Sequence, residues 1–272
     1  MSLKEKNTAL AIVAHPDDAE LTCAGSLALL KDRGWQIGLA TMTPGDCGTA
    51  LLSREEISHI RKDEAANAAS LLGASYHCLE CEDIFISYDK PTLIKVIELI
   101  RKMQPGMVFT MSPDCYMVDH ETTSKLVRTA CFSAGIKNIE TGSPPFFHTP
   151  HLYYVDAMEG RDKYGQEISP GMIVDISGKI SIKEEMLACH ASQREWLRTH
   201  HGMDEYIHAM RRFAAKRGAD AGVPFGEGFR QHLGHAFPKN NLLSQELGIL
   251  VKESLNLANT LGNEIISNKS SF

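Results

Sequence analysis

An α/β fold, with a mainly parallel sheet flanked by helices, is the fold class that the sequence predicts. Through the first half of the 272 residues, short apolar runs typical of buried strands alternate with longer segments of helical periodicity. Strands separated by helices of this length indicate βαβ units, whose parallel strands are covered on both faces. The pattern loosens only beyond residue 135, where we expect additional strands and helices.

The expected elements of the first half follow one another in βα order. We expect strands at 8–14, 35–42, 76–79 and 107–111, and helices at 21–33, 53–72 and 91–103. The helix at 53–72 carries its apolar side chains on one face and ends before Gly73. The helix at 91–103 has Pro91 in its first turn, where the missing N–H is not needed.

The second half is expected to be less regular. The segment TGSPPFFHTPH at 141–151 is predicted to be a loop, because three prolines deny it regular structure. Further elements are expected as strands at 152–155 and 172–176, helices at 181–199 and 204–217, a helix after Asn241, and a shaped loop near the site at 222–228. The sum is a Rossmann-like, mainly parallel sheet flanked by helices, with additional C-terminal strands and helices.

No linker divides the chain, so we expect a single domain over residues 1–272. Its core would span about 8–135 and its C-terminal, substrate-side portion about 136–272. The composition, 43% hydrophobic and 23% charged, is typical of a soluble globular protein. The net charge of -6 gives no reason to expect nucleic acid as a partner.

Targeting and membrane segments are not expected either. Only six small or aliphatic residues, 9–14, precede charged ones near the amino terminus, which excludes a signal peptide. No uncharged apolar stretch approaches the ~18 residues that a membrane-spanning helix needs. The seven cysteines, an odd number, are therefore expected to be reduced thiols in a cytoplasmic protein.

The strongest functional signal is the sequence His-Pro-Asp-Asp-Ala-Glu at 15–20, directly after the first strand. The carboxyl ends of parallel strands face the ligand crevice, where so many polar residues would be costly to bury without a function. His15 and Asp18 can both reach one ion, and imidazole with carboxylate suits zinc or another first-row divalent metal. The alternative is that Asp17 or Asp18 merely caps the following helix.

A second motif, Asp119-His120, follows the strand expected at 107–111 and therefore lies at the same edge of the sheet. His120 would supply a third ligand and leave one or two positions open for water and substrate. Three protein ligands are typical of a catalytic zinc site, whereas structural sites are usually closed by four. A single histidine such as His120 would more often be a surface residue. It indicates a metal site only in combination with the first motif.

These motifs resemble the PIG-L/LmbE-like family of zinc-dependent N-acetylglucosaminyl deacetylases. The segment AHPDDAEL at 14–21 is the most specific mark. Further similar segments are Arg61-x-x-Glu64, Asp119-His120, 174–177, Lys183 with 190–193, and 227–230. The resemblance covers residues 8 to about 235, which is nearly the whole chain.

The resemblance implies metal ligands at His15, Asp18 and His120, with Zn²⁺ as the cofactor and another divalent metal such as Fe²⁺ as the alternative. It implies that Asp17 is the general base that activates the metal-bound water. Asp119 matches a carboxylate that the family places near the metal in support of catalysis. The implied reaction is hydrolysis of a linear amide C–N bond, which gives acetate and a free amine.

The implied substrate is a small N-acetylated sugar or glycoside. Arg61 matches an arginine that contacts the sugar in relatives, and Asp46, in the loop at 44–48, is a candidate for binding sugar hydroxyls. Nucleic acid and membrane are not expected as partners. Relatives often assemble, so a homo-oligomer stays open.

One position departs from the family pattern. Relatives have a histidine two positions before the Asp of the Asp-His pair, where it helps to stabilise the oxyanion, but here the residue is Met117. A thioether cannot donate a hydrogen bond, and loss of one oxyanion donor typically costs about 10²–10³-fold in rate. Candidate replacements are His151, His190, His232 and His235. The alternatives are a non-catalytic sugar- or metal-binding relative and a hydrolase of a different amide or ester.

Overall fold

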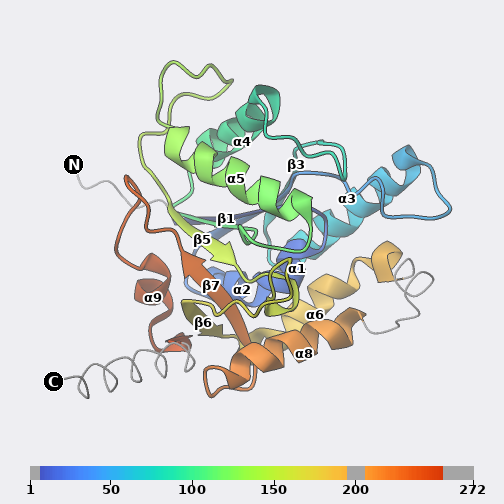
Figure 1. The fold of residues 1–272 in the computed structure, drawn as a ribbon, viewed down its shortest axis with the longest axis vertical. Helices are drawn as coiled ribbons and strands as arrows, with labels where there is room; N and C mark the ends of the chain where they lie inside the picture. The colour runs from blue at the N-terminus through green and yellow to red at the C-terminus, as the bar shows by residue number, and fades with distance from the viewer. Residues whose placement is uncertain (1–6, 195–205, 254–272) are drawn as a thin grey trace.

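The computed structural model describes residues 7–194 and 206–253. Within these residues, eight strands form one sheet in the order β3-β2-β1-β4-β5-β7-β6-β8 (Figure 1). The strands are β1 Thr8–Val13, β2 Gln36–Thr41, β3 Ser75–Cys78, β4 Met107–Thr110, β5 His151–Val155, β6 Met172–Asp175, β7 Gly226–Gln231 and β8 Val251–Lys252. The strands β3, β2, β1, β4 and β5 are parallel, whereas β7 runs antiparallel to both β5 and β6, and β8 antiparallel to β6. The predicted α/β fold with a mainly parallel sheet is therefore confirmed.

The central strand β1 shows why the strands of the first half could be predicted from the sequence. All six of its residues are buried, and it pairs in parallel with β2 on one side and β4 on the other. A strand covered on both faces has to be largely apolar, and every residue of this one after Thr8 is apolar. The six strands expected from the sequence each lie within one residue of their predicted ends.

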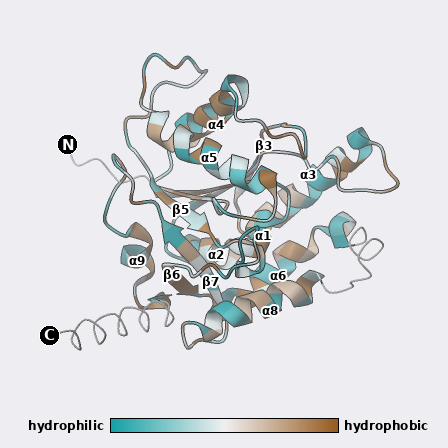
Figure 2. Cartoon of the chain, in the orientation of Figure 1, coloured by the Kyte–Doolittle hydropathy of each residue, from teal (hydrophilic) through white to brown (hydrophobic). Residues whose placement is uncertain are grey.

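Helices cover both faces of the sheet. They are α1 Asp18–Thr22, α2 Ala24–Asp32, α3 Arg54–Leu71, α4 Lys90–Met103, α5 Val118–Ser133, α6 Ile180–Ala188, α8 Tyr206–Ala219 and α9 Leu242–Leu247, with short 3-10 turns η1 Met158–Gly160, η2 Ser177–Lys179 and η3 Gly248–Leu250. Figure 1 shows α4 and α5 on one side of the sheet and α2 and α6 on the other. The helix α4 buries Val96, Ile97 and Ile100 while it also carries hydrophilic residues (Figure 2).

Several predicted elements differ in the structure. The helix expected at 21–33 is broken at Cys23, whose φ of -143° and ψ of 4° separate α1 from α2. The helix α6 ends at Ala188, earlier than expected, while residues 195–199, residues 204–205 and the tail beyond 253 lie outside the described residues. No helix among the described residues is long and apolar enough to cross a membrane.

The strand β7 corrects the expectation of a loop at 222–228. Gly226 and Gly228 lie inside this strand. Both positions require glycine, because their neighbours leave no room for a side chain. A Cβ on Gly226 would lie 2.6 Å from Ile173 Cγ2, and one on Gly228 would lie 2.9 Å from Pro170 Cβ. The strand thus brings the C-terminal half into the sheet beside β5.

Candidate active site

The candidate site begins in the turn that joins β1 to α1. Asp17 occupies the N-cap position of α1 with a left-handed backbone, φ 108° and ψ -25°, and its side chain makes no capping hydrogen bond. Positive φ is uncommon outside glycine, and such strain clusters at functional sites. Asp18 Oδ2 instead accepts a hydrogen bond from the backbone N of His15 at 2.8 Å. The alternative that Asp17 merely caps the helix therefore has no support in the geometry.

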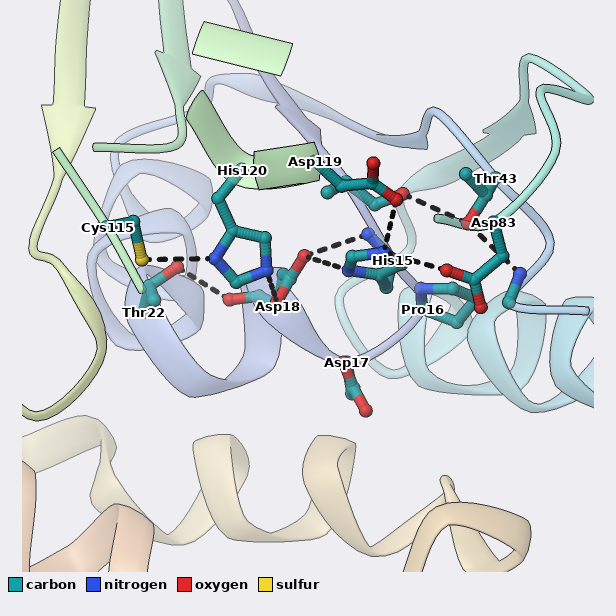
Figure 3. A network of polar contacts seen from close by, with 12 residues as sticks. His15, Pro16, Asp17, Asp18, Thr22, Thr43, Asp83, Cys115, Asp119 and His120 are labelled. Atoms are coloured by element: carbon teal, nitrogen blue, oxygen red, sulfur yellow. Dashed lines mark hydrogen bonds and ion pairs between the residues drawn. The ribbon is translucent and has the colours of Figure 1, made fainter. Parts of the chain in front are cut away.

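The three predicted metal ligands come together at the ends of β1 and β4. His15 Nδ1 lies 3.3 Å from Asp18 Oδ2, and His120 Nε2 lies 3.5 Å from Asp18 Oδ1 (Figure 3). All three side chains are buried, and one donor atom of each lies within 4.8 Å of the others. Cys115 Sγ contacts His120 Nδ1 at 3.2 Å, so the other ring nitrogen faces Asp18. Two imidazoles and a carboxylate at these spacings suit a divalent first-row metal.

Two further carboxylates hold the other side of His15. Its Nε2 lies 3.3 Å from Asp119 Oδ2 and 3.2 Å from Asp83 Oδ1. Ile84 N also donates to Asp119 Oδ2, at 2.8 Å. Carboxylates commonly orient metal-binding histidines in this way. Asp119 thus contacts a candidate ligand, and sequence reasoning missed Asp83 because no motif marks it.

The charges of the cluster favour a bound cation. Burial lowers the pKa of His15, but hydrogen bonds with Asp119, Asp18 and Asp83 outweigh burial and place this pKa well above its usual range. Burial raises the pKa of Asp18, yet His120 and His15 lower it to about 2. Burial lowers the pKa of His120, which favours the neutral imidazole that binds metals. Asp119 Oδ1 is buried without a hydrogen-bond partner among the described residues. A metal would offset this excess of buried negative charge.

A second group of potential ligands combines His15, Asp83 and Asp119. It would use Nε2 of His15, the nitrogen that already faces the two carboxylates. Orientation of the ligand explains these contacts without a second ion. The group that contains Asp18 and His120 is therefore the candidate metal site.

Asp46 lies behind Asp83 and is held by other residues of the protein. Its Oδ2 accepts from Arg54 Nε at 2.8 Å, and its Oδ1 accepts from the backbone N of Asp83 at 2.8 Å. Together with Asp83 and the exposed Cys47 it could form a third ligand group. Both its oxygens are already engaged, however, and it is not among the described residues that line the pocket at the site. The structure thus does not bring this predicted sugar-binding residue to the pocket.

Asp17 points away from the His15–Asp18–His120 cluster in Figure 3, toward residues from other parts of the chain. Its Oδ2 accepts a hydrogen bond from the Tyr206 hydroxyl at 2.7 Å and lies 3.5 Å from Arg61 Nη2. Burial raises the pKa of Asp17, whereas Arg61 and the Tyr206 hydrogen bond act in the opposite direction. A raised carboxyl pKa suits a general base, because it lies closer to the working pH.

Arg61 is fixed by the loops around it. Its Nη2 donates to Pro16 O at 2.7 Å and its Nη1 donates to Gly45 O at 3.1 Å. Gly45 has a φ of +72°, and a Cβ there would lie 2.2 Å from Arg61 Nη1, so only glycine fits. Arg61 lines the pocket, although much of its hydrogen-bonding capacity serves the protein itself.

A pocket of about 330 Å³ contains Asp17 and the three candidate ligands in its lining. Met117 lies on its wall, so the departure from the family pattern falls at the site itself. None of the four candidate replacement histidines is among the described residues that line it. Tyr116 and Tyr206 do line it, and each carries a hydroxyl. Tyr206 comes from α8, far along the chain, and no sequence motif marked it.

Known proteins are similar to this chain in sequence and in fold. Residues 10–131 match the family model "PIG-L: GlcNAc-PI de-N-acetylase". The 4-oxalmesaconate hydratase of Pseudomonas putida is 26% identical over 196 residues, which cover 69% of this chain and 74% of that protein. The diacetylchitobiose deacetylase of Thermococcus kodakarensis is 27% identical over 192 residues, which cover 68% of this chain and 69% of that protein.

A solved structure extends the similarity beyond the matched range. The N,N'-diacetylchitobiose deacetylase from Pyrococcus horikoshii, complexed with its inhibitor MPG, superposes with a TM-score of 0.72 at 25% identity. The superposition covers 89% of this chain and 92% of that one. The predicted resemblance to the PIG-L/LmbE-like family is thus confirmed, and residues 10–131, which include Asp17 and the three candidate ligands, are the part of the chain that matches its model.

Proposed function

We propose that this protein is a metal-dependent hydrolase that removes the acetyl group from a small N-acetylated amino sugar. The observation that carries the proposal is the position of Asp17, which takes no part in capping α1 and lines the same pocket as His15, Asp18 and His120. Similarity to two diacetylchitobiose deacetylases supports the substrate class. A protein that only binds sugar or metal has no need of a base at this position.

The group His15, Asp18 and His120 would hold the metal, for which we propose Zn²⁺, with another divalent metal such as Fe²⁺ as the alternative. When bound, such a cation acidifies water and polarises an amide carbonyl. Asp119 would keep His15 in the orientation that binding requires, because it contacts the opposite ring nitrogen.

Asp17 would carry the proton through the reaction. As water attacks the acetamide carbonyl, the Asp17 carboxylate accepts a proton from the water, and the water oxygen forms a bond to the carbonyl carbon. When the C–N bond breaks, Asp17 returns the proton to the amine, so the products are acetate and a free amino sugar. Tyr206 and Arg61 would position the carboxylate, since both contact Oδ2.

A hydratase is the second candidate, because one relative is a 4-oxalmesaconate hydratase. That name denotes a polycarboxylate substrate, which needs cationic side chains for binding. Arg61 is the one Arg or Lys among the described residues that line the pocket, and it already contacts three groups of the protein. The same lining includes Asp17, Asp18 and Asp83. The excess of carboxylates favours a neutral sugar.

The test measures acetate release from N-acetylglucosamine and N,N'-diacetylchitobiose, with bound metal quantified in every sample. We expect Asp17→Asn to retain its metal and to lose about 10²-fold or more in kcat, the usual contribution of a general base. The matched control is Asp63→Asn, whose side chain is 67% exposed on α3. Metal-loaded protein that releases no acetate, but adds water to an unsaturated dicarboxylate, would establish the hydratase instead.

A further inference from the structure

A second pocket, of about 560 Å³, adjoins the one that contains the candidate ligands. Its apolar lining includes Leu21, Met158, Ala209, Met210 and Phe213. Pockets of this size are typical of small-molecule sites, which are mostly apolar with a few polar groups. The proposed reaction at the metal leaves this space without a role.

The two pockets share part of their lining. Both are lined by Leu21, Tyr116, Met158 and Tyr206. The shared side chains also contact the candidate site: the Tyr206 hydroxyl donates to Asp17 at 2.7 Å, and the Tyr116 ring meets His120 edge-on with centroids 5.5 Å apart. A molecule whose acetamide lies beside Asp17 can therefore extend directly into the second pocket.

One face of α8 forms part of the wall of this second pocket. Tyr206, Met210 and Phe213 recur at helical spacing and all line this pocket. Met210 is buried and the other two are half-buried, so the wall is apolar. An apolar wall of this kind is stabilised when it covers an apolar ligand and thereby leaves water.

The charged residues that line this pocket do not suit an acidic ligand. Arg161 is the one Arg or Lys among the described residues that line the pocket, and its Nη1 donates to the carbonyl O of Gly165 at 2.6 Å. Glu159 and Asp162 lie beside it, so carboxylates outnumber cations. These carboxylates would repel a phosphate or carboxylate group of a ligand.

We propose that the substrate is a glycoside of an N-acetylated amino sugar whose aglycone is an apolar alkyl or aryl group bound in this second pocket. This inference rests on the proposed deacetylase function and names its substrate class. The acetamide lies in the pocket of the candidate ligands, and the aglycone passes between Tyr116 and Tyr206 to reach Phe213.

The experiment compares kcat/KM for acetate release from the methyl, hexyl and phenyl β-glycosides of N-acetylglucosamine. Each buried methylene contributes up to about fourfold, so we expect the hexyl glycoside to exceed the methyl glycoside by about tenfold or more. In Phe213→Ala this hexyl-to-methyl ratio should fall toward one. The control Phe147→Ala removes an exposed ring that is not among the described residues lining either pocket, and it should preserve the ratio.

Each outcome separates this inference from the proposed function. Equal kcat/KM for the methyl and hexyl glycosides, or a preference for an N-acetylglucosaminide with a carboxylate aglycone, would overturn the inference and leave the deacetylase standing. If no glycoside releases acetate, the proposed function fails, and calorimetric titration with hexyl β-glucoside then tests the pocket alone. Binding that Phe213→Ala weakens supports an apolar site, and absence of binding overturns it.

Discussion

The buried ion pair between Lys183 and Glu227 ties the C-terminal half of the chain to the helices that follow the candidate site. Lys183 Nζ lies 2.5 Å from Glu227 Oε1 and donates to Leu21 O at 3.1 Å. The Glu227 carboxylate also accepts from the backbone N of Gly25 and of Ser26, at 2.9 and 2.8 Å, at the start of α2. Substitution of Lys183 by methionine would leave this carboxylate without its cation.

The magnitude follows from burial. Both side chains are at most 2% exposed, and removal of one partner from a buried pair costs about 3–5 kcal/mol. The backbone donors at the start of α2 still favour the carboxylate, so we expect about 3 kcal/mol for Lys183→Met. For a protein of this size that corresponds to a fall in Tm of roughly 6–12 °C.

A neighbouring lysine provides the matched control. Lys179 lies 2.6 Å from Asp32, but these side chains are 26% and 57% exposed. Exposed pairs contribute about 0–1 kcal/mol, so Lys179→Met should change stability little. The assay is urea denaturation of the metal-loaded protein, with the free energy of unfolding taken from each midpoint and slope.

A double variant tests the physical cause. Glu227→Gln removes the charge that Lys183→Met leaves unpaired, so the double variant should be no less stable than Lys183→Met alone. If Lys183→Met and Lys179→Met lowered the free energy of unfolding equally, the reasoning would be refuted, because burial would then not increase the contribution of the Lys183–Glu227 pair to stability.

Three substitutions at the candidate site should separate metal binding from turnover. Tyr206→Phe removes the hydroxyl that holds Asp17 and should lower kcat for acetate release by about tenfold with metal content unchanged; an unaltered kcat would argue against positioning by this hydroxyl. Asp119→Asn should weaken metal affinity by about 10–100-fold in a competition titration with a chelator, because the carboxylate orients His15; equal affinity would contradict that role. Met117→His should restore a hydrogen-bond donor on the pocket wall and raise kcat by up to about 10²-fold, whereas a lower rate would indicate that another group already serves.

The elements that could be predicted are those whose own sequence shows that they are buried or where they begin. β1 is covered on both faces, so its sequence is one apolar run, and the capping box of Ser53 and Glu56 marks the start of α3. β7 has no such signal, because its glycines and charged residues show neither an apolar run nor alternation. Its place depends on close packing against Ile173 and on the pairing of Glu227 with Lys183, which are contacts between distant segments.

The same distinction applies to the site. His15, Asp18 and His120 could be brought together from the sequence because each follows a strand of a parallel sheet. Tyr206 and Asp83 could not, since their positions depend on how α8 and a loop pack after the sheet has formed. Asp46 has suitable chemistry, yet its carboxylate is held by Arg54, eight residues on, which its residue type cannot reveal.

The division between the two halves bears on how the relatives of this chain can include both a hydratase and a deacetylase. The range that matches the family model, 10–131, contains the candidate ligands and Asp17, the groups proposed to activate water. Tyr206 and most of the second pocket's lining lie beyond it, on α8 and around η1. Water activation is therefore expected to be common to relatives, whereas we expect the choice of the bond that water attacks to depend on the later residues. An exchange of 206–219 between relatives should consequently change substrate preference more than metal affinity.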